Sequence, residues 1–109
     1  MEGGAFRFAS RITNTGTAAL LIDAAASLQV PLPATAERII SWRGRHNAEL
    51  SECREAMPQH GWQRISRRGI SGHGGPPGVY VLDRNAGWHT GLAYALQLAW
   101  SGDSVIGIE

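Results

Sequence analysis

The sequence has no lysine, only one cysteine and no long apolar run. With Cys53 alone, no disulfide can form within the chain. The longest apolar runs, such as Ala18–Ile22, are too short to span a bilayer. The first four residues, Met-Glu-Gly-Gly, lack the basic and apolar regions of a signal peptide. These absences predict a soluble, cytoplasmic protein that does not contact membranes.

Charged residues are also scarce, at 17% of the chain against 43% hydrophobic residues, which predicts a globular protein. Its length suits a single domain over residues 1–109. Eight of the ten arginines lie between Arg38 and Arg84, where only four acids accompany them. A preference for arginine over lysine explains the missing lysine but not this clustering. A basic middle between acidic ends predicts a one-sided patch for an anionic partner.

Helical spacing of apolar residues predicts three helices in the first half of the chain, after a short alternating strand at Ala5–Ala9. They are expected at Thr17–Leu28, Thr35–Trp42 and Asn47–Met57, where Asn14 or Thr15, Thr35 and Asn47 can cap the first free N–H groups. The second and third helices are separated by the turn Arg43–His46, which contains Gly44.

Strand-forming residues dominate the next part of the chain. Trp62–Ile70 and Val79–Asp83 are expected to form two strands joined by a flexible tip rich in Gly and Pro. A last helix is expected at Thr90–Trp100 and a short strand at Val105–Ile108. The predicted fold class is therefore α+β.

From Thr15 to Asp83, this order of helix, helix, turn, helix and hairpin resembles the winged helix-turn-helix family. The resemblance implies a winged-helix-like core over residues 15–83, made of three helices plus a β-hairpin. It also implies DNA binding, with the third helix in the major groove and the hairpin on the phosphate backbone. Residues 84–109 would add an extra C-terminal helix and short strand, for packing or dimerisation.

The candidate nucleic-acid-binding residues follow from this resemblance and from the chemistry of arginine, which binds phosphates in a bidentate manner. Two arginines flank the start of the third helix, three lie on the first hairpin strand, and a histidine lies on the tip. Asn47 and Ser51 are candidate base readers. The full set is Arg43, Arg45, Asn47, Ser51, Arg64, Arg67, Arg68 and His73.

The exposed face of the expected third helix is acidic, because it carries Glu49, Glu52 and Glu55. Acidic side chains repel phosphates, so the arrangement favours gripping the DNA backbone over reading bases. The resulting hypothesis is a small, non-enzymatic and regulatory DNA-binding protein. The alternative is a protein-interaction module, an adaptor or inhibitor, on the same scaffold.

Other chemistry finds less support in the sequence. His46, Cys53, His60 and His73 could supply zinc ligands, but Cys53 falls on the expected apolar face with Leu50 and is interpreted as a small core residue. A buried thiol would also be inert as a nucleophile. The sequence therefore predicts no catalytic residue, no metal and no cofactor.

Four tryptophans are many for a chain of this length, and most are expected in the core. The expected helix between Trp88 and Trp100 is apolar on more than one face. Such a helix is buried either in an interface or in a core. Two interpretations stay open at this point: a homodimer or partner surface, or packing that closes one larger core.

Overall fold

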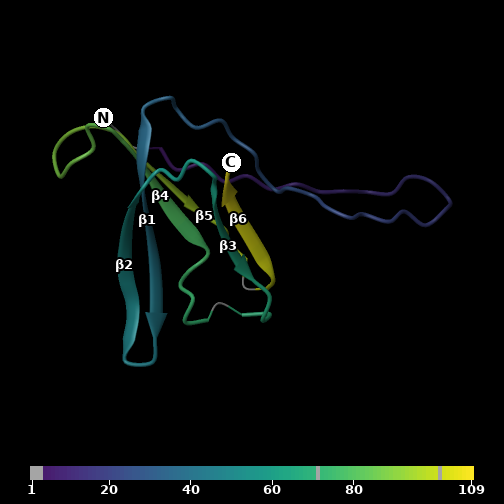
Figure 1. The fold of residues 1–109 in the computed structure, drawn as a ribbon. Helices are drawn as coiled ribbons and strands as arrows, with labels where there is room; N and C mark the ends of the chain where they lie inside the picture. Colours follow the sequence, from purple (N-terminus) through teal and green to yellow (C-terminus); the bar gives the residue numbers. More distant parts are fainter. Residues whose placement is uncertain (1–3, 71, 101) are drawn as a thin grey trace. The chain divides into compact units, whose positions relative to one another are not determined.

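The computed structural model describes residues 4–70, 72–100 and 102–109, and these residues contain strands but no helix. The chain divides into two compact units, residues 1–32 and 33–109. The described residues form six strands, all of which belong to the second unit (Figure 1). Their bounds are β1 (Ala36–Arg45), β2 (Ala48–Ala56), β3 (Trp62–Ser66), β4 (Gly78–Asp83), β5 (Ala93–Gln97) and β6 (Ser104–Ile108).

The strands form two antiparallel sheets. The larger sheet has the order β2-β1-β4-β5, and the smaller sheet pairs β3 with β6. β1 is therefore an inner strand, hydrogen-bonded to β2 on one side and to β4 on the other. The α+β prediction and its winged-helix-like core are wrong, since the described chain is all β.

The fully buried side chains lie on one face of the larger sheet, where β1 and β4 are neighbours, and Ile40 is buried on the other face. Ile39 and Val81 pair across these strands, and both are fully buried. Ser41 and Val79 continue the same face two residues along each strand, because side chains alternate between the faces of a sheet. On the opposite face, Trp42 meets Tyr80 edge to face, with ring centroids 4.9 Å apart.

The second and third expected helices are β1 and β2, which form a hairpin. Arg45 pairs with Ala48 across the two-residue turn His46–Asn47, and Asn47 takes a left-handed φ of 61° that asparagine tolerates. Gly44 lies inside β1, at a register shift between Arg43 and Arg45. A Cβ there would lie 2.8 Å from the Cα of Glu49, so the bulge needs a glycine.

The segments predicted as two wing strands do contain strands, but they do not pair with each other. β3 pairs with β6, and β4 lies between β1 and β5. The described residues therefore form no wing hairpin. The expected helix at Thr90–Trp100 is replaced by a loop and the edge strand β5.

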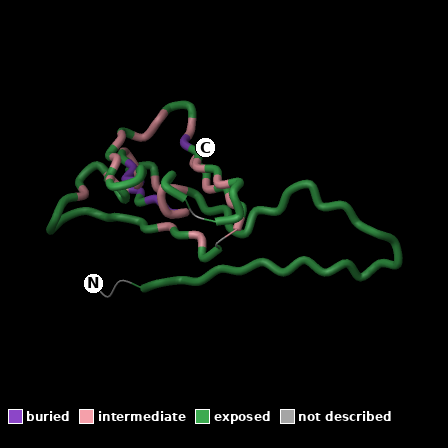
Figure 2. Tube along the Cα trace, turned by 90° about the horizontal axis from the view of Figure 1, so that it is seen from below, coloured by how far each residue is buried: buried purple, intermediate pink, exposed green. Residues whose placement is uncertain are grey.

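The first unit contains no helix or strand in its described part, residues 4–32. It doubles back on itself, since Ser10 Oγ donates a hydrogen bond to the carbonyl of Ser27 at 3.1 Å. Asn14 shapes the turn through its side-chain bonds with Gly16 and Ala18. Figure 2 shows that residues 4–31 are exposed throughout. The strand predicted at Ala5–Ala9 and the helix predicted at Thr17–Leu28 are therefore absent.

The tryptophans are distributed differently from the prediction. Trp62 is buried, with 8% of its surface exposed, and Trp42 is half-buried. Trp88 and Trp100 are 91% and 63% exposed.

No helix in the part of the chain that the structure describes is long and apolar enough to cross a membrane. The cytoplasmic location and the single domain stay predictions.

Candidate functional site

Successive side chains along each strand of the smaller sheet point to opposite faces of the sheet. Trp62, Arg64 and Ser66 of β3 share one face, where each is more buried than the residue that follows it. Arg64 pairs with Ile106, and Ser66 pairs with Ser104 across the sheet. This face therefore combines apolar, cationic and hydroxyl groups.

Arg64 is held by several contacts at once. Its Nη1 donates hydrogen bonds to the carbonyls of Trp42, Gly74 and Pro76 at 2.5, 2.7 and 3.3 Å. Its guanidinium carbon lies 5.6 Å from the centroid of the Trp62 ring, within the range of a cation–π contact. Arg64 thus ties the loop between β3 and β4 to β1.

Burial and the positive charge of Arg43 lower the pKa of the Arg64 guanidinium, although Cys53 and Glu55 oppose this shift. No carboxylate forms an ion pair with Arg64 among the described residues. Carbonyl oxygens alone accept hydrogen bonds from this half-buried charge. They solvate the guanidinium but carry no formal charge to balance it.

A hollow of about 230 Å³ opens beside Arg64, between the face of the smaller sheet and the loop that precedes β4. Arg67 and Arg68, which follow β3, line it together with Ser66, Ser104 and Ile106. No acidic residue lies among its lining residues. The structure thus brings together three of the predicted site residues, Arg64, Arg67 and Arg68.

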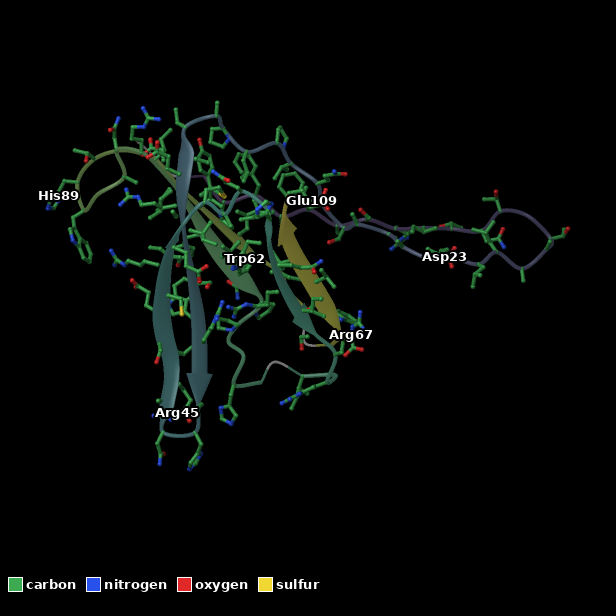
Figure 3. The ribbon with its side chains drawn as sticks, viewed as in Figure 1. Asp23, Arg45, Trp62, Arg67, His89 and Glu109 are labelled. Carbon is green, nitrogen blue, oxygen red and sulfur yellow. The ribbon has the colours of Figure 1, made fainter. Side chains whose placement is uncertain are left out.

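The remaining predicted site residues lie elsewhere. Arg43 pairs with Glu55 at 3.6 Å on the hairpin of β1 and β2, and Arg45 and Asn47 lie at the tip of that hairpin. Ser51 lies on β2 and donates to the carbonyl of Ala48. His73 lines a second hollow with Glu49 and Leu50. In Figure 3, Arg45 at the hairpin tip and Arg67 beyond β3 are well separated.

Two polar residues of the hollow were missed in the sequence, Ser66 and Ser104. Their pairing across β3 and β6 joins segments 38 positions apart, which local spacing does not reveal. The available signal was the short strand expected at Val105–Ile108, and this strand prediction did not identify a partner strand. Leu50, expected in the core, is 64% exposed on β2, and Cys53 is half-buried. The described residues contain no group of three or more His, Cys, Asp or Glu side chains able to hold a metal ion.

Comparison with known proteins gives one positive finding. Residues 1–109 match the sequence model of the family described as "Glycosyl hydrolase family 36 N-terminal domain". No curated protein matches the chain, and no solved structure matches it.

This family match and the absence of helices from the described residues correct the functional hypotheses. The resemblance to a winged helix, the DNA-binding regulatory role and the adaptor or inhibitor on the same scaffold are wrong, since the scaffold itself is absent. A partner surface on a Trp88–Trp100 helix is also wrong, because that segment is a loop and a strand. The match instead associates the chain with an enzyme family. The chain belongs to the family of glycosyl hydrolase family 36 N-terminal domains.

Proposed function

We propose that this chain serves as the non-catalytic N-terminal domain of a glycoside hydrolase. The observation that carries the proposal is the family match over all 109 residues. Its role would be to contact other parts of the enzyme, while the chemistry takes place outside residues 1–109.

The acidic side chains support a non-catalytic role. Glycosidases generally use two carboxyl groups that flank the scissile bond, one of them acting as a proton donor. In the hairpin region, three glutamates are instead engaged in surface ion pairs with arginines: Glu37 with Arg84 at 2.6 Å, Glu55 with Arg43 at 3.6 Å, and Glu52 with Arg54. These three carboxylates are thus occupied by arginine partners on the surface of the strands.

The exposed apolar side chains support a role in contacts. Trp88 is 91% exposed on the loop between β4 and β5, and Trp100 follows β5 at 63%. That loop is held in place, since Arg38 Nη2 donates to the carbonyl of Ala86 at 2.7 Å and Thr90 Oγ1 donates to the carbonyl of Asn85 at 3.1 Å. Tryptophan is enriched at protein interfaces, because its ring buries a large apolar area while its N–H can keep a polar partner.

An immunocapture experiment tests the association with an enzyme. Antibodies raised against the 109-residue chain are used to capture the native protein from its source, and the captured material is assayed on a panel of aryl α- and β-glycosides. We expect glycosidase activity that free 109-residue antigen removes by competing for the antibody. Captured antigen without such activity would refute the proposal.

A second assay tests the non-catalytic character. The purified 109-residue chain is incubated with the same aryl glycosides, and we expect release of the aryl alcohol at the rate found in buffer. Turnover that scales with the concentration of the chain would place catalytic groups inside residues 1–109 and contradict this part of the proposal.

A further inference from the structure

The hollow between the smaller sheet and the loop before β4 has an unusual charge balance. Three of its lining side chains are cationic and none is acidic. The nearest acid along the chain, Asp103, precedes β6 and accepts a hydrogen bond from the backbone N–H of Gly69 at 2.8 Å. The positive charge of the hollow is therefore not balanced by its own walls.

The hydrogen-bonding groups of the hollow are mostly donors. Arg64 uses Nη1 for three carbonyls, and its Nε and Nη2 have no hydrogen-bond partner within the described chain. Arg67 and Arg68 likewise form no ion pair there. Ser104 adds a hydroxyl on the same face as its cross-strand partner Ser66, whose own hydroxyl donates to the carbonyl of Ile70 at 3.3 Å. Guanidinium and hydroxyl donors are the groups that proteins use to bind oxyanions.

The position of Arg64 is fixed before any ligand arrives. Its contacts with the Trp62 ring and with three carbonyls hold the guanidinium in one orientation. A preorganised donor loses little conformational entropy on binding, so more of the interaction energy appears as affinity. The burial that lowers the pKa of Arg64 also strengthens its attraction to an anion, since fewer water molecules screen the charge.

We propose that this hollow, lined by Arg64, Arg67, Arg68, Ser66 and Ser104, is a binding site for a compact oxyanion, a phosphate, sulfate or carboxylate group. Its volume of about 230 Å³ is below the roughly 300–1,000 Å³ of pockets that enclose drug-sized ligands, which favours a small group. This site is independent of the proposed enzyme association, because it follows from the geometry of one sheet and one loop.

The test is a titration followed by nuclear magnetic resonance on the whole 109-residue chain. Sodium phosphate, sodium sulfate and sodium glucuronate are added separately, with sodium chloride keeping the ionic strength constant. We expect saturable shifts of the backbone amides of Gly72 and Gly74, which line the hollow, and of Arg64 Nε. Tighter binding of phosphate and sulfate identifies a tetrahedral oxyanion as the ligand, and tighter binding of glucuronate identifies an acidic sugar. Absence of saturable shifts with all three anions would overturn the proposal.

Matched charge variants separate a specific site from general attraction. Arg67→Ala and Arg68→Ala each remove one charge from the hollow, and Arg45→Ala removes one from the hairpin tip, away from it. Loss of one charge-assisted hydrogen bond weakens binding about tenfold. We expect this loss for Arg67→Ala or Arg68→Ala, and less than a twofold change for Arg45→Ala. Equal weakening by all three variants would show unspecific attraction and refute the site. Arg64 is left intact because its replacement would also release the loop from β1.

Discussion

Ser41 is a polar residue at the centre of an apolar face. It is fully buried on β1, and its hydroxyl has no hydrogen-bond partner within the described residues. Burying an unpaired hydroxyl is unfavourable by about 1–3 kcal/mol. We therefore predict that Ser41→Ala leaves the free energy of unfolding unchanged or raises it by about 1 kcal/mol. Urea denaturation followed by tryptophan fluorescence measures this change, and a loss above 1 kcal/mol would mean that the hydroxyl has a partner in solution.

Gly75 allows the loop before β4 to approach β1. Its φ of 99° is disfavoured for other residues, and a Cβ at this position would overlap the carbonyl oxygen of Trp42 and the guanidinium of Arg64. We predict that Gly75→Ala destabilises the protein by at least about 1–3 kcal/mol, the typical cost of such a strained backbone. Gly74→Ala is the matched control, because a Cβ there meets open space. Thermal unfolding of the two variants compares them, and equal midpoints would argue against this role of Gly75.

β1 shows why spacing alone gave a helix where the structure has a strand. Ala36, Ile39 and Ile40 follow helical spacing, but an inner strand with both faces covered also buries consecutive residues. Ile39, Ile40 and Ser41 are all buried in this way. Whether this segment forms a helix or a strand depends on its pairing with β2 and β4. Spacing within the ten residues of β1 does not show those partners. The strands at β3, β4 and β6 were recognisable because they contain Trp, Tyr, Val and Ile, which favour strands.

The position of a strand in its sheet also determines how sensitive its residues are to substitution. Ile39 of β1 is fully buried, whereas Ile65 of β3 is 49% exposed. We predict that Ile39→Ala lowers the free energy of unfolding by about 2–5 kcal/mol through the cavity that it leaves. Ile65→Ala, the same chemical change, should alter it by about 0.5 kcal/mol or less. Chemical denaturation measures both values, and similar losses would indicate that Ile65 is also buried in solution.

At the scale of the molecule, the sequence revealed the cationic residues of the hollow but not their surroundings. Arg64, Arg67 and Arg68 were singled out because the resemblance placed them on one hairpin strand and because arginine binds phosphates. Their serine neighbour Ser104 joins them only through the long-range pairing of β3 with β6. The arginines of the hairpin were grouped with them because a helix was expected there. The neighbours of a residue in space depend on which strands pair with each other. The spacing of residues along one short segment does not reveal that pairing.

The two units of the chain should differ in their resistance to proteolysis. Arg7 and Arg11 lie in the unit of residues 1–32, where the described chain is exposed and has no sheet hydrogen bonds. Arg43 and Arg54 lie within the paired strands β1 and β2. Because trypsin needs an accessible, locally unfolded segment, strand sites are cut only after the sheet opens. We predict that trypsin at low concentration cleaves after Arg7 and Arg11 before it cleaves after Arg43 or Arg54. Mass spectrometry of samples taken over time gives the order of cleavage. The same digestion in urea should abolish this order, whereas early cleavage at Arg43 or Arg54 in native buffer would show that the β1–β2 hairpin opens more readily than the first unit.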